Sequence, residues 1–121
     1  MPTVLIVDDS LFMRVTIGNI LKEYGFEVVG EAANGKEAVL LYDQLLPDLV
    51  TMDITMPVMT GIEAVRRITA KHSDANIIMI TALGQQSKIK SAIESGAKDF
   101  ITKPFQPEQL KEVASNVLNL T

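Results

Sequence analysis

Three aspartates, one threonine and one lysine are the residues of this chain whose types and positions suggest chemistry. Asp8 and Asp9 follow one apolar run, and Asp53 follows another. Thr81 and Lys103 end two later runs of the same kind. Carboxylates brought together repel, by about 4 kcal/mol for a pair ~4 Å apart at an effective dielectric constant of ~20. Such a cluster is tolerable where it holds a hard cation such as Mg2+, which prefers oxygen ligands.

The threonine hydroxyl and the lysine ammonium could bind an anion on the opposite rim of the same site. A carboxylate that lies between a bound cation and an anion-binding site is an arrangement suited to phosphoryl transfer. In this arrangement Asp53 would be the nucleophile. Taken singly, residues 8–10 could be only a turn and a helix N-cap, and Asp53 only a turn residue. Their joint placement with Thr81 and Lys103 after four separate apolar runs argues against that purely structural interpretation.

The elements that must position these side chains follow from hydrophobic patterning. Residues 3–7 (TVLIV) form an almost continuous apolar, β-branched run, which is typical of a strand buried on both faces. Met13, Ile17 and Leu21 then recur at helical spacing. Applied along the chain, the same patterns predict strands at 3–7, 27–32, 49–52, 76–82 and 99–102, and helices at 13–24, 38–45, 62–71, 88–95 and 107–118.

Five strands alternate with five helices in this prediction. Regular alternation favours an α/β fold with a parallel sheet, because right-handed crossovers place helices on both faces. Ligands of such sheets bind beyond the carboxyl ends of the strands. We therefore expect the carboxylates, the hydroxyl and the ammonium to meet in one crevice there.

Composition limits the remaining classes of function. The chain has 121 residues, 47% hydrophobic and 21% charged, as expected for a single globular domain over residues 1–121. Its net charge of -4 argues against nucleic acid and anionic membranes as partners. It has no cysteine, which excludes disulfides and zinc–thiolate sites, and one histidine, His72, expected only to interact with a helix C-terminal dipole. Without a signal peptide or a membrane-length apolar segment, we expect a cytoplasmic protein.

The segments VLIVDDS, VTMDITMP, IIMITA and KDFITKPF resemble, in this order, the marks of bacterial response-regulator receiver domains. The resemblance covers essentially all 121 residues. It implies a flavodoxin-like doubly wound (βα)5 fold with strand order 2-1-3-4-5. It also implies a two-component phosphoacceptor, which promotes only its own phosphorylation and dephosphorylation and is not otherwise an enzyme.

By the same resemblance, Asp53 accepts a phosphoryl group from a histidine kinase. Asp9, Asp53 and the main-chain carbonyl of Thr55 would bind Mg2+ directly, and Asp8 would bind it through water. Thr81 would bond a phosphoryl oxygen, and Lys103 would pair with that group.

Other positions carry expectations from the family as well. Phe100 stands at the position of the switch aromatic, which is often tyrosine, and it lacks the phenol hydroxyl. The bond before Pro104 is expected to be cis. Thr55 and Leu83 occupy variable positions that tune the dephosphorylation rate.

Rival classes of protein require motifs that differ from those present. A flavodoxin-like FMN-binding protein needs a Ser/Thr/Gly-rich loop after the first strand, where this chain has Asp8 and Asp9. The P-loop and dinucleotide-binding glycine motifs do not occur. A haloacid-dehalogenase-type phosphatase has a second aspartate two residues after its nucleophile, and here that residue is Thr55. A phosphorylation-independent receiver would have lost one of the five site residues, and none is missing.

Within the family, the resemblance favours a chemotaxis regulator. Its partners would be the chemotaxis histidine kinase, the flagellar motor switch and a phosphatase, and we expect a monomer. A phosphorelay intermediate or another single-domain receiver remains open. The chain ends just after the last predicted helix, so we expect output by protein binding through residues 88–118 and no attached DNA-binding domain.

Overall fold

The computed structural model describes residues 1–120, in which five strands alternate with five helices. The strands are β1 (Thr3–Val7), β2 (Glu27–Ala32), β3 (Leu49–Asp53), β4 (Ile77–Thr81) and β5 (Asp99–Thr102). The helices are α1 (Leu11–Glu23), α2 (Gly35–Leu45), α3 (Gly61–Lys71), α4 (Gln86–Glu94) and α5 (Pro107–Leu118).

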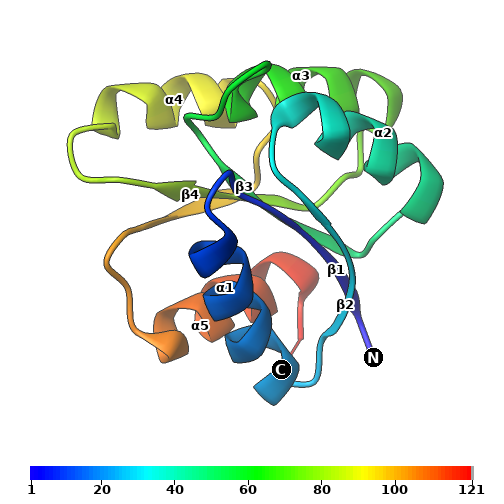
Figure 1. The fold of residues 1–121 in the computed structure, drawn as a ribbon, viewed down its shortest axis with the longest axis vertical. Helices are drawn as coiled ribbons and strands as arrows, with labels where there is room; N and C mark the ends of the chain where they lie inside the picture. Colours follow the sequence, from blue (N-terminus) through cyan, green and yellow to red (C-terminus); the bar gives the residue numbers. More distant parts are fainter. Residues whose placement is uncertain (121) are drawn as a thin grey trace.

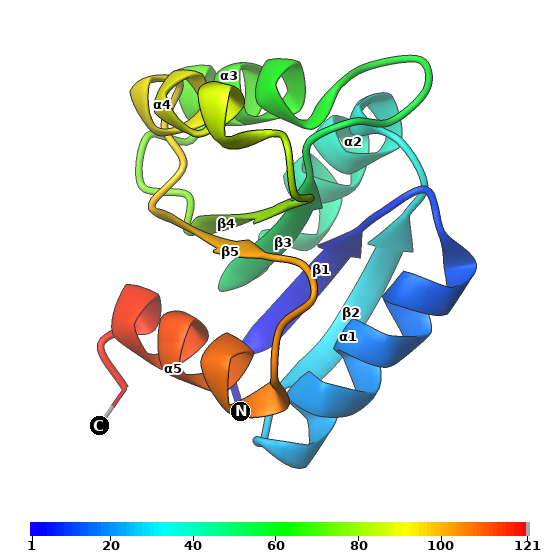
Figure 2. The same ribbon diagram turned by 90° about the vertical axis from the view of Figure 1, so that its left-hand side faces the viewer.

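The strands form one parallel sheet in the order β2-β1-β3-β4-β5. Helices α1 and α5 cover one face of this sheet, and α2, α3 and α4 cover the other (Figure 1). Figure 2 shows the same two helical layers after a quarter turn. The expected flavodoxin-like (βα)5 fold and its strand order are confirmed.

Each face of the sheet has its own apolar core. The central strands β1, β3 and β4 are almost completely buried, which explains their nearly continuous apolar sequences. Towards α2–α4, Met52 and Met79 pack with Val65 and other buried side chains. Towards α1 and α5, Ile6 and its neighbours pack with helical residues such as Leu110.

Helix boundaries follow local capping signals. The side chain of Ser10 accepts a hydrogen bond from the Met13 N–H and begins α1 at Leu11, two residues before the predicted start. Asn34 caps α2 in the same way. Helix α4 also begins two residues early, at Gln86, because its first turn is polar and exposed and therefore shows no apolar periodicity.

Within residues 1–120, no helix is both long enough and apolar enough to span a membrane.

Candidate functional site

Strand register brings the three aspartates together. Val7 at the end of β1 pairs with Met52 on β3, so the residues that follow, Asp8 and Asp53, lie side by side at the carboxyl end of the sheet. Oxygen atoms from Asp8, Asp9 and Asp53 all lie within 4.8 Å of one another. Asp8 and Asp53 are buried, and Asp9 is exposed. The predicted convergence of the carboxylates is present.

The loop after β3 is held against the end of that strand by a close backbone approach. The Gly61 N–H donates to the carbonyl of Ile54 at 2.8 Å. A methyl group at Gly61 would collide with the main-chain carbonyl oxygen of Asp53. A glycine is therefore required where α3 begins, and this contact fixes the backbone around Asp53.

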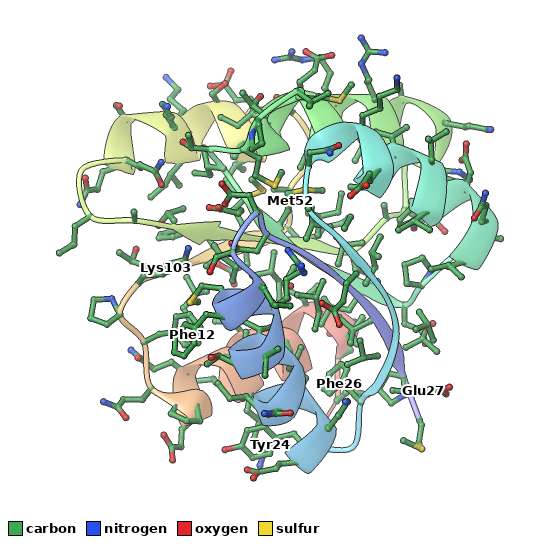
Figure 3. All side chains as sticks on the ribbon, in the orientation of Figure 1. Phe12, Tyr24, Phe26, Glu27, Met52 and Lys103 are labelled. Atoms are coloured by element: carbon green, nitrogen blue, oxygen red, sulfur yellow. The ribbon has the colours of Figure 1, made fainter. Side chains whose placement is uncertain are left out.

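Lys103 lies on the connection that follows β5 (Figure 3). Its Nζ is 3.5 Å from Asp8 Oδ2 and 3.9 Å from Asp53 Oδ1. The backbone positions it, because its N–H donates to the Thr81 carbonyl at 2.7 Å. The sequence suggested an anion clamp on the rim opposite the cation site, whereas here the ammonium contacts the carboxylates directly. Opposite charges at this separation attract, so Lys103 offsets part of the cluster's repulsion.

The Thr81 hydroxyl is buried at the end of β4 and is directed towards β5. Its Oγ1 lies 3.1 Å from Thr102 Oγ1 and 3.4 Å from the Ile101 carbonyl, to which it donates. Phe100 pairs with Met79, two residues before the Thr81–Thr102 pair, so Thr81 and Phe100 are diagonal neighbours. The Phe100 residue is 39% exposed.

The remaining predicted positions lie on loops around the crevice. Thr55 is exposed two residues beyond Asp53, and Leu83 is exposed on the β4–α4 loop. The peptide bond between Lys103 and Pro104 is cis, as the resemblance implied.

The electrostatic environment raises the pKa of Asp53. Burial, foremost, and the negative charge of Asp8 raise the pKa of Asp53 from 3.8 to about 6. The Lys103 ammonium opposes this rise, and the negative charge of Asp9 adds to it. Asp53 is therefore a carboxylate at neutral pH, held in an environment that favours the binding of a proton or a cation.

Sequence reasoning missed two residues that contact the site. Arg14 on α1 donates from Nη1 to the Asp8 carbonyl at 2.7 Å and from Nε to Glu31 at 2.9 Å. Gln85 bonds the loop that follows Asp53. Neither contact could be predicted from the sequence, because a polar residue on a helix or loop does not indicate which residue far along the chain it will bind.

His72 ends α3, as expected, but it also has a specific partner on another helix. Its Nε2 lies 2.8 Å from Asp43 Oδ1 on α2, and its ring packs at 5.0 Å from that of Tyr42. These contacts lie at the opposite end of the sheet from the aspartates, so His72 connects two helices rather than serving the site.

Comparison with protein families gives a match over residues 4–115 to the response regulator receiver domain. The chain belongs to this family. The chemotaxis protein CheY of Listeria monocytogenes is 56% identical over 89% of this chain and 91% of its own. CheY of Bacillus subtilis is 54% identical over 96% of this chain and 97% of its own. This receiver is thus similar to CheY proteins along almost their whole length.

A solved structure also resembles this receiver closely. The chain matched in the CheX–CheY–BeF3–Mg2+ complex from Borrelia burgdorferi superposes with a TM-score of 0.91 at 39% identity. The alignment covers 95% of this chain and 87% of that one. Receivers of this CheY-like group are signalling proteins of two-component systems, which confirms the coarse assignment made from the sequence.

Proposed function

We propose that Asp53 is the phosphoacceptor of this receiver. The observation that carries the proposal is the position of Asp53: a buried carboxylate at the end of the central strand, grouped with Asp8 and Asp9, with the Lys103 ammonium 3.9 Å from it and 3.5 Å from Asp8. A carboxylate nucleophile beside further oxygen ligands and an ammonium suits transfer of a highly charged phosphoryl group.

The reaction is a substitution at phosphorus. An oxygen of the Asp53 carboxylate forms a bond to the phosphorus of a phosphohistidine, while the P–N bond breaks and its electron pair leaves with the imidazole. Lys103 then pairs with a phosphoryl oxygen in place of its carboxylate partners. The Thr81 hydroxyl must turn away from Thr102 to donate to the same group, which alters its contact with β5.

The donor set around Asp53 fits Mg2+. Its three side chains offer carboxylate oxygens, the hard ligands that this ion prefers. Asp9, Asp53 and the Thr55 carbonyl would bind the ion directly, and Asp8 through water. When bound, Mg2+ would offset the negative charge that gathers between the Asp53 carboxylate and the phosphoryl oxygens.

We further propose a role in chemotaxis. The similarity to CheY of Listeria and Bacillus supports a chemotaxis histidine kinase as the donor and the flagellar motor switch as the target. The Borrelia complex of CheX with CheY supports an additional binding protein, which we propose removes the phosphate. The protein would act as a monomer, with residues 1–121 as one receiver unit.

Phosphorylation by acetyl phosphate tests the acceptor assignment. With Mg2+ present, intact-mass spectrometry should show one added phosphate on the wild type and none on Asp53→Asn. Asp74→Asn removes an exposed carboxylate elsewhere and should behave as the wild type. Full phosphorylation of Asp53→Asn would place the acceptor on another residue.

A binding experiment separates the chemotaxis role from a phosphorelay role. The phosphorylated protein should be captured by a flagellar switch protein more strongly than the unphosphorylated protein. Capture by a histidine-phosphotransfer protein alone would identify a phosphorelay intermediate.

A further inference from the structure

The side chain of Gln85 bridges the two loops that follow β3 and β4. Its Oε1 accepts from the Ala82 N–H at 2.7 Å, and its Nε2 donates to Thr55 Oγ1 at 2.7 Å. Thr55 lies two residues beyond Asp53, and Ala82 directly follows Thr81. The Gln85 amide therefore connects the loop that follows Asp53 to the end of β4, where Thr81 lies.

The bridge is built into the start of a helix. The Gln85 N–H donates to the Ala82 carbonyl at 3.2 Å, and the Gln85 carbonyl accepts from the Lys88 N–H at 2.9 Å. Gln85 is the residue that precedes α4. A shift of the Gln85 main chain would therefore alter the first turn of α4 together with the β4–α4 loop.

Two donors at the end of β4 are already engaged by acceptors of the protein. The Thr81 hydroxyl is bonded on β5, and the Ala82 N–H is bonded to Gln85. A phosphoryl group on Asp53 would bring strongly accepting oxygens to this strand end. To donate to such an oxygen, the Ala82 N–H must release the Gln85 amide.

We propose that Gln85 is a positioning residue that acts as a latch. Its amide competes with the phosphoryl group for the Ala82 N–H at the end of β4. It holds the β4–α4 loop to Thr55 until the phosphoryl group displaces it. The proposal rests on Asp53 as the phosphoacceptor. Displacement would free both ends of the bridge at once, because one side chain makes both bonds. The latch would thereby transmit the state of Asp53 to α4.

Binding of beryllofluoride, a non-covalent substitute for the phosphoryl group, tests the latch. The affinity would be measured at saturating Mg2+ by NMR, following the Ala82 amide. Removing competing hydrogen bonds should tighten binding, so Gln85→Ala and Thr55→Val should each increase affinity about two- to tenfold. The double variant should gain less than the product of the single gains, because both substitutions break the same bridge.

Gln86→Ala provides the matched control. Gln86 is the adjacent glutamine, and its Oε1 accepts from the Gly84 N–H without reaching Thr55. This variant should bind beryllofluoride as the wild type does. In Gln85→Ala the affinity for Mg2+ alone should stay within about twofold of the wild type, since Gln85 is not a proposed ligand.

The outcomes distinguish the latch from the acceptor assignment. Unchanged or weaker beryllofluoride binding in Gln85→Ala and Thr55→Val, or independent gains in the double variant, would overturn the latch and leave the acceptor assignment intact. Wild-type protein that does not bind beryllofluoride with Mg2+ would overturn the acceptor assignment and the latch together. If Gln85→Ala does not fold, Thr55→Val tests the same bridge from its other end.

Discussion

Replacing Asp53 with asparagine should stabilise the metal-free protein at neutral pH, by an amount that shrinks as the pH falls. In the folded protein, burial and the charge of Asp8 raise the pKa of Asp53 from 3.8 to about 6. The folded state therefore binds this proton more tightly than the unfolded chain does. The stability that the protonated carboxyl contributes is fully present below pH 3.8 and is lost as the pH rises through about 6. Asparagine keeps the shape of the side chain and never ionises.

The two pKa values set the size of the effect. Between 3.8 and about 6, the full cost of ionising Asp53 in the folded state is about 3 kcal/mol. We expect Asp53→Asn to gain about 3 kcal/mol at pH 7.5 and about half of that gain at pH 5. At pH 7.5 this corresponds to a rise in Tm of roughly 10 °C.

Urea denaturation followed by circular dichroism, with a chelator present, measures the free energy of unfolding of each protein from pH 5 to 8. Glu94→Gln on α4 is the control, because it removes an exposed carboxyl far from the crevice. Its difference from the wild type should not follow the same pH curve. An Asp53→Asn protein that is no more stable at pH 7.5, or whose advantage is constant with pH, would refute the argument that burial and charge crowding strain Asp53.

Three further predictions concern the same region and its supporting strand. Asp9→Ala should raise the metal-free Tm by relieving repulsion and should abolish stabilisation by Mg2+; in the wild type, ~10 mM Mg2+ adds about 1.4 kcal/mol, or about 3–6 °C, if its Kd is ~1 mM. Thermal melts test both effects, and a lower metal-free Tm or a retained Mg2+ response would contradict the cation site. Thr81→Ala should still accept phosphate but lose the phosphorylation-dependent gain in partner affinity. In the wild type, the Thr81 hydroxyl turns towards the phosphoryl group and so makes space for the Phe100 ring, and the alanine has no hydroxyl to make this movement. An equal gain in partner affinity, measured by titration calorimetry, would discard that switch. Thr51→Val should stabilise the protein by about 1 kcal/mol, since the buried Thr51 Oγ1 has no hydrogen-bond partner within residues 1–120; a lower denaturation midpoint would show that the hydroxyl contributes to packing.

The order and type of the elements could be predicted from the sequence because they depend on local patterns. Apolar runs such as residues 3–7 can be buried only as central strands, and the spacing of Met13, Ile17 and Leu21 places one helical face on the core. The aspartates were identifiable because parallel strands bring their carboxyl ends to one edge of the sheet. The strand order came instead from family resemblance, since local patterns do not state which strands pair.

Only the tertiary structure decided which side chains make contact at that edge. Lys103 and Asp8 are 95 residues apart in the sequence, and Gln85 and Thr55 are 30 apart. Their contacts depend on loop paths and side-chain rotamers that no local periodicity encodes. The raised pKa of Asp53 has the same origin, because burial and neighbouring charge are properties of the packed crevice. The sequence therefore determined that the three aspartates, Thr81 and Lys103 reach the site, whereas packing decided their partners, the additional contacts of Arg14 and Gln85, and the raised pKa of Asp53.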